Sequence, residues 1–279
     1  MSTVGPTVVR RQLGRRLREL RNGTGMTVDE VTADRYLGIS RAKLFRLEAG
    51  KHSVKPQDIS ILCGQYGITA REEVKTLQAL ALATQERSWW HIYGEGAVPE
   101  WFSLFVDLEP MASVHRHYEV EVVPGLLQTR DYAWALFRAY NPEHDLDEIE
   151  RSVEVRMHRQ KVFEHAPSPN LHAVINEAAL LRTVGGDRVM AAQLASLREA
   201  ADRPEVTIDV LPLSAGAHAA MNGAFVRLDF PDPTEDPSMA YIETACSAAY
   251  LEKPTETSRY DSIFDWILPR TVPLHNYSP

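Results

Sequence analysis

The sequence predicts an all-α N-terminal domain followed by a larger α+β domain with helices and a small mixed sheet. Residues 7–85 hold five short apolar patterns at helical spacing, separated by glycines or capping residues. From residue 170 onward, β-rich runs alternate with helical patterns. The charge is divided as well. Residues 1–60 contain 12 Lys or Arg against six Asp or Glu, a net +6, and the remainder contains 18 against 32, a net −14. Such an asymmetry is typical of a nucleic-acid-binding module joined to another domain.

The composition excludes several classes of protein. No apolar run approaches the roughly 18 residues of a membrane-spanning helix, and no signal peptide is expected at the basic N-terminus. The two cysteines, Cys63 and Cys246, are far apart, which favours neither a disulfide framework nor a structural zinc site. We therefore expect a cytoplasmic protein.

The first two helices follow from apolar spacing and capping. Apolar residues recur at spacings of three and four over residues 8–20, which predicts an amphipathic helix that ends at the glycines after it. Thr27 and Glu30 have the spacing of a capping box, so a second helix is expected to begin there and to run to about Tyr36.

The third helix is short, capped and basic. Ser40 is placed as its N-cap, Ile39 and Leu44 form a hydrophobic staple, and Gly50 ends it. A second helix, a tight glycine-containing turn and a basic third helix together predict a helix-turn-helix.

In a helix-turn-helix, the third helix has one face that packs in the core and one face that is free to contact DNA. Leu44 and Leu47 should face the core, which leaves the basic side chains near the helix N-terminus free to enter a DNA major groove. Arginine suits this place because its planar fork can donate two hydrogen bonds to guanine. The residues expected to contact DNA, including those that suit phosphates, are Arg15, Arg16, Thr27, Ser40, Arg41, Ala42, Lys43, Arg46, Lys51 and Lys55.

Two further helices complete the N-terminal domain, one opening at Pro56 and one over residues 71–85. Residues 1–85 are therefore interpreted as the helix-turn-helix domain, residues 86–105 as an aromatic linker and residues 106–279 as a regulatory domain. In that domain we expect mostly helix over 107–165, strands in LHAVI, VTIDVLP, GAFVRLDF and MAYIETAC, helices over about 187–201 and 255–268, and a frayed C-terminal tail.

The second domain offers no catalytic constellation. It has neither a G-x-S-x-G elbow nor a phosphate-binding loop, and Cys246 is expected to be an inert thiol buried in an apolar strand. No His, Cys or carboxylate set has the spacing of a metal site. We expect no enzymatic activity, no cofactor and no metal.

The segment MTVDEVTADRYLGISRAKLFRLEAGKHSVKP resembles the Cro/C1-repressor-type, or xenobiotic response element (XRE), helix-turn-helix. The family's spacing of Ser, aliphatic, aliphatic, Glu and Gly is matched from Ser40 to Gly50. Two positions depart from it: Val28 stands where the family often has Gln, and Phe45 stands where a small Ser or Thr is usual. VTADRYLGIS is also one residue longer than the usual turn.

The rest of the chain resembles the actinobacterial C-terminal domain of unknown function DUF5753, most specifically in the string PGLLQT. The two resemblances imply a sequence-specific transcriptional regulator, of a kind often encoded beside a small protein of another uncharacterised family, DUF397. We expect it to bind DNA as a homodimer, because half-sites lie about 34 Å apart. The alternative is an interaction protein in which the DUF397-type partner is primary and DNA binding is secondary.

In the second domain, two polar groups have competing interpretations. For the residues of the PGLLQTRDYA string we favour packing and helix capping, and for the polar residues on one face of the next helix we favour a face exposed to solvent; the alternative for both groups is contact with a ligand or partner. These residues are Gln128, Thr129, Arg130, Tyr132, Arg156, Arg159 and Gln160.

Overall fold

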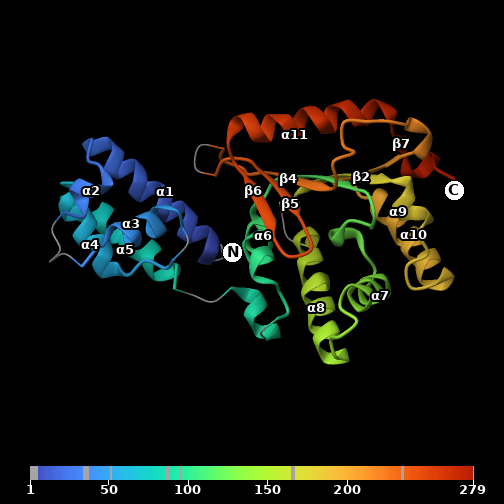
Figure 1. Cartoon of the computed structure of the whole chain (residues 1–279), viewed down its shortest axis with the longest axis horizontal. Helices are drawn as coiled ribbons and strands as arrows, with labels where there is room; N and C mark the ends of the chain where they lie inside the picture. Colours follow the sequence, from blue (N-terminus) through green and yellow to red (C-terminus); the bar gives the residue numbers. More distant parts are fainter. Residues whose placement is uncertain are drawn as a thin grey trace. The chain divides into compact units, whose positions relative to one another are not determined.

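The computed structural model describes residues 6–33, 38–50, 52–85, 88–94, 96–164, 167–233 and 236–278. The chain divides into two compact units, Met1–Trp89 (unit 1) and Trp90–Pro279 (unit 2), which are shown in Figure 1. Across these ranges no helix has the length and apolar character needed to cross a membrane.

Unit 1 is all-α, as predicted, and its core lies between five helices. These are α1 (Pro6–Thr24), α2 (Val28–Val31), α3 (Arg41–Glu48), α4 (Pro56–Gln65) and α5 (Arg71–Ala83). Leu13 and Leu17 of α1 pack with Leu44 and Leu47 of α3, and all four side chains are buried. This apolar cluster holds α3 rigidly on its neighbours.

The second helix is shorter than its sequence predicts. It begins at the expected capping box but ends at Val31, and the backbone N–H and the hydroxyl of Thr32 both donate to the carbonyl of Val28. Such side-chain bonding to the preceding turn competes with continuation of the helix. The last residues of the predicted helix, 34–36, lie outside the described residues.

Unit 2 contains a seven-stranded mixed sheet in the order β6-β5-β4-β1-β2-β3-β7. The strands β1, β2 and β3 are parallel, and β4, β5, β6 and β7 pair antiparallel. Their bounds are β1 (Val114–Glu119), β2 (Asn170–Asn176), β3 (Val206–Leu211), β4 (Phe225–Asp229), β5 (Met239–Glu243), β6 (Ala248–Leu251) and β7 (Val272–Pro273). The predicted α+β class is confirmed, with a larger sheet than expected.

Helices cover both faces of this sheet, and Figure 1 shows α11 on one face and the other long helices of unit 2 on the opposite face. The helices are α6 (Glu100–Leu108), α7 (Arg130–Tyr140), α8 (Leu146–Arg159), α9 (Glu177–Leu181), α10 (Asp187–Ala201) and α11 (Pro254–Ile267). The segment interpreted as an aromatic linker thus contains the 3₁₀ helix η2 (Trp89–Tyr93) and the start of α6.

Three features of unit 2 differ from expectation. Strand β1 replaces part of the predicted helical region, because His115, His117 and Glu119 on its face toward α8 are polar and give no apolar alternation. The C-terminal tail is not frayed: β7 pairs with β3, and Leu274 is buried in the core. Cys246 is exposed, because Thr244 and Ser247 bond to each other across the turn that follows β5.

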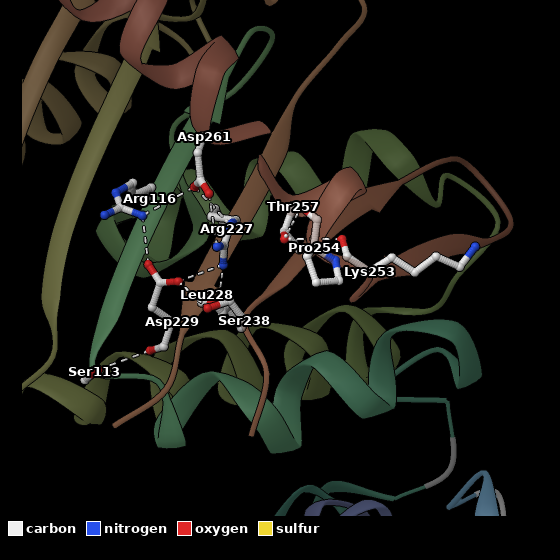
Figure 2. Close-up of polar contacts among 10 residues, drawn as sticks. All are labelled: Ser113, Arg116, Arg227, Leu228, Asp229, Ser238, Lys253, Pro254, Thr257 and Asp261. Atoms are coloured by element: carbon white, nitrogen blue, oxygen red, sulfur yellow. Dashed lines mark hydrogen bonds and ion pairs between the residues drawn. The ribbon is translucent and has the colours of Figure 1, made fainter. Parts of the chain in front are cut away.

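A network of ion pairs joins α11 to the sheet (Figure 2). Arg116 of β1 and Arg227 of β4 are directly opposite in the strand register, so that two like charges are neighbours. Asp229 compensates both, at 2.8 Å from a guanidinium nitrogen of each, and Asp261 of α11 lies 3.1 Å from Nε of Arg227. These residues and Asp265 line a hollow of about 280 Å³. Since Asp229 and Asp261 are paired with the two arginines, the network serves to hold α11 on the sheet.

Candidate functional site

The helix-turn-helix begins with two capped helices. The side chain of Thr27 accepts a hydrogen bond from the backbone N–H of Glu30, whose carboxylate accepts one from the N–H of Thr27 in return. The side chain of Ser40 accepts a hydrogen bond from the N–H of Lys43 and so caps α3. Both caps were predicted, and they show that Thr27 and Ser40 satisfy helix N-termini in the protein alone.

The third helix has one buried face and one exposed face. Leu44, Leu47 and Glu48 are buried, as the core of unit 1 requires. The exposed face carries Arg41, Ala42, Phe45, Arg46 and Ala49. Arginines 41 and 46 therefore project away from the core, in the arrangement that a major-groove helix needs.

Two contacts that sequence reasoning missed set the position of α3 on α1. Arg21 donates to both carboxylate oxygens of the buried Glu48, at 2.7 and 3.0 Å, and also to the carbonyl of Met26. The hydrogen bonds to Glu48 raise the pKa of Arg21, which keeps its charge in this buried pair. A Cβ atom at Gly14 would lie 2.5 Å from the carbonyl oxygen of Leu47, so the glycine permits the close approach of the two helices. A glycine inside an apolar helical pattern is a signal that could have identified this contact.

The predicted basic residues are placed in different ways. Arg41 is exposed and pairs with Asp29 at 3.0 Å. Lys43 points toward α4 instead, and its Nζ lies 2.7 Å from the buried carboxylate of Asp58. Arg16 is half-exposed and contacts Glu73 at 3.3 Å. Arg15 is half-buried, and Lys51 lies outside the described residues.

A basic hollow of about 260 Å³ lies beside the C-terminal end of α3. The exposed Lys55 and Arg46 line it, together with His52 and Ser53. The paired Lys43 and Asp58 line it too. The exposed cations around this concave surface suit a phosphate group.

In unit 2, the residues of the PGLLQT turn complete the packing of the fold. The buried Gln128 donates to the carbonyl of Val123 at 2.7 Å, and Thr129 caps α7. The hydroxyl of the buried Tyr132 accepts a hydrogen bond from the N–H of Val123. Arg130 is exposed and pairs with Glu150 and Glu154 of α8.

The residues at the end of α8 behave differently from one another. Arg159 is buried and makes a two-pronged ion pair with Glu109, at 2.7 and 2.8 Å. Gln160 donates to the carbonyls of Gly125 and Gln128. Arg156 is half-buried, and its guanidinium lies 5.0 Å from the centre of the Phe137 ring. No carboxylate among the described residues lies within ion-pairing distance of Arg156.

Arg156 faces the polar side of β1. Burial raises the pKa of Glu119 to about 8, and burial lowers the pKa of Arg156 to about 10. Burial also lowers the pKa of His117 well below its usual range, which leaves a neutral imidazole. Within the described part of the chain, the ring nitrogens of His117 and Nε of Arg156 have no hydrogen-bond partner. This set of unpaired polar atoms is the second candidate site of the protein.

The capped α2–turn–α3 unit with its exposed arginines defines a helix-turn-helix protein, the class that includes many DNA-binding regulators. A family model for the helix-turn-helix domain matches residues 12–77, and the model of the domain of unknown function DUF5753 matches residues 102–273. The chain therefore belongs to the DUF5753 family. No curated protein and no solved structure matches the chain.

Proposed function

We propose that this protein is a sequence-specific DNA-binding transcriptional regulator whose helix α3 enters the major groove. One observation carries the proposal: α3 is anchored through Leu44 and Leu47 while Arg41 and Arg46 point into solvent. In this proposal Arg41, near the N-terminus of α3, donates two hydrogen bonds to a guanine. Arg46 and Ala42 complete the surface that faces the bases.

Electrostatics support the same proposal. Residues 1–60 carry a net +6 and the rest of the chain a net −14, so the attraction to DNA is confined to unit 1. The exposed Lys55 and Arg16 contact phosphates, which contributes affinity without sequence preference. Two copies bind together as a homodimer, because a single helix reads only a few base pairs and half-sites one helical turn apart lie about 34 Å from each other.

The test is to select binding sites for the full chain from random double-stranded DNA and to measure affinity for the selected sequence. Arg41→Ala should weaken specific binding by about 10- to 100-fold, because a bidentate contact to guanine is worth about 1–3 kcal/mol. Lys75→Ala is the matched control, since Lys75 is an exposed cation of α5 that pairs with Glu72 outside the proposed interface. Unchanged specific binding by a folded Arg41→Ala variant would refute the role of α3.

For unit 2 we propose a regulatory role without catalysis, in which a small anionic molecule is sensed. Arg156 supports it, because its guanidinium has no carboxylate within ion-pairing distance among the described residues and its Nε has no hydrogen-bond partner there, which favours a ligand with a carboxylate or phosphate. The test is urea unfolding of the full chain, followed by tryptophan fluorescence, with a panel of small carboxylates and phosphates. Stabilisation by one of them should be lost in Arg156→Met, and a panel without effect would count against sensing.

The competing proposal is that unit 2 binds a small protein of the DUF397 type and that DNA binding is secondary. Retention of the DUF397-type protein by residues 90–279 with unchanged DNA binding by the complex would favour it. Loss of the complex from DNA when the partner is added would instead make the partner a regulator of DNA binding.

A further inference from the structure

Phe45 occupies the middle of the DNA-facing arc of α3. Successive residues of an α-helix advance by about 100°, so Phe45 projects about 40° from Arg41 and lies between Arg41 and Ala42. Its side chain is 47% exposed, and it is one of the few large apolar side chains exposed on unit 1. An exposed aromatic ring among arginines is not needed for the core, which Leu44 and Leu47 fill on the opposite face.

The ring also lies beside the arginine that is proposed to read the groove. The guanidinium carbon of Arg41 lies 5.8 Å from the centre of the Phe45 ring, and Asp29 holds the same guanidinium at 3.0 Å from the other end. Phe45 and Arg41 therefore form one surface, apolar on one side and a hydrogen-bond donor on the other. We therefore expect Phe45 to contact a base pair next to the one that Arg41 contacts.

We propose that Phe45 is a specificity-determining residue that contacts the 5-methyl group of a thymine. This inference rests on the proposed function. Among the base edges in the major groove, thymine alone carries a methyl group, whereas adenine, guanine and cytosine present donors or acceptors. An apolar ring laid against those polar edges would remove their water without giving a hydrogen bond in return. Phe45 thus selects thymine and disfavours the other bases.

The spacing places this thymine close to the guanine of Arg41. Base pairs stack about 3.4 Å apart, so a separation of 5.8 Å between guanidinium and ring fits a thymine one or two base pairs away. The selected DNA should therefore contain a thymine at a fixed distance from a guanine in each half-site.

Replacement of thymine by deoxyuridine tests this contact, because it removes the methyl group and keeps the base pairing and the O4 acceptor. Each thymine of the selected site is replaced in turn, and the affinity of the full chain is measured at one fixed salt concentration. Burial of one methyl group corresponds to about a four-fold change, so one position per half-site should weaken binding by about that factor. Phe45→Ala should bind the thymine and deoxyuridine sites equally, and Leu82→Ala, which changes another exposed apolar residue of unit 1, should keep the difference.

The outcomes separate this inference from the proposed function. If the full chain selects no DNA sequence, the proposed function itself fails. If it selects DNA but every deoxyuridine substitution is neutral, or the loss is the same in Phe45→Ala, then Phe45 does not read a methyl group and the inference is overturned. The deoxyuridine series on the unmodified protein shows, without any variant, whether a thymine methyl group is read. If Phe45→Ala does not fold, Phe45→Leu, which keeps an apolar side chain, takes its place.

Discussion

A methyl group added at Gly14 should loosen the helix-turn-helix, although alanine is the better helix former. In the interior of a helix, Gly→Ala is ordinarily stabilising by about 1 kcal/mol. At Gly14, however, the new Cβ would lie 2.5 Å from the carbonyl oxygen of Leu47 and 3.0 Å from the amide nitrogen of Gly50. These obstructing atoms belong to the backbone, so they cannot rotate away, and α1 and α3 must separate by about half an ångström.

The two effects have opposite signs, and the clash is the larger. Overpacking of this kind costs about 1–3 kcal/mol, and the rigid backbone places Gly14→Ala near the upper end, so the net loss of stability is about 2 kcal/mol. Gly23→Ala in the same helix is the matched control, since nothing lies within 4 Å of its added Cβ. It should leave the stability unchanged or raise it by up to about 1 kcal/mol.

Hydrogen exchange of the full chain, measured by mass spectrometry, reports this difference within unit 1. Peptides from α1 and α3 should exchange about 30-fold faster in Gly14→Ala, as a loss of about 2 kcal/mol implies. Peptides from unit 2 serve as an internal reference and should not change. Slower exchange in both Gly14→Ala and Gly23→Ala would show that helix propensity dominates and that the close approach of α1 to α3 is wrong.

Three further outcomes are expected. Lys55→Ala should reduce the magnitude of the slope of log affinity against log salt by about one. Lys43→Ala should leave that slope unchanged, because Lys43 is paired with Asp58. Equal slopes for the two variants would contradict this expectation. Arg227→Ala removes the buried cation from the network and leaves Arg116 as the remaining partner of Asp229 and Asp261. It should destabilise unit 2 by about 3 kcal/mol in urea unfolding, the lower end for breaking a buried pair, whereas the more exposed Arg116→Ala should cost about 1 kcal/mol. Similar losses for the two variants would count against this network. The pKa of Glu119 is raised by burial to about 8, with Arg156 and Glu243 facing it, so its proton stabilises unit 2 fully below pH about 4 and progressively less as the pH rises through about 8. Glu119→Gln should flatten that fall in the urea midpoint, and an unchanged pH profile would exclude Glu119 as its source.

The parts of the fold that the sequence predicts are those specified by neighbouring residues. Ser40, Leu44 and Gly50 lie within 11 positions of each other, and their caps, staple and stop were enough to place α3. The pair of Arg21 and Glu48 spans 27 positions, and nothing local at either residue points to the other. The exposed arginines were therefore predictable, but the contacts that orient them were not.

The missed strand β1 illustrates a second limit. Apolar periodicity reveals a strand when its buried face is apolar. On β1 the face toward α8 holds the polar residues His115, His117 and Glu119. The same limit applies at the C-terminus, where the two residues of β7 are too few to give a pattern and depend on the edge of β3. Tertiary pairing specifies both strands.

The polarity that hides β1 from sequence reasoning also supports the proposed ligand site beside this strand. A buried donor or acceptor without a partner costs about 1–3 kcal/mol, and His117 and Arg156 both contribute such atoms among the described residues. Apolar side chains at these positions would avoid the cost, and the adjoining strand β2 has them at Leu171 and Ala173 on the same face. Packing alone thus gives no reason for the polar row. A molecule that completed these hydrogen bonds would recover the cost on binding, and unit 2 would be more stable with it than without it.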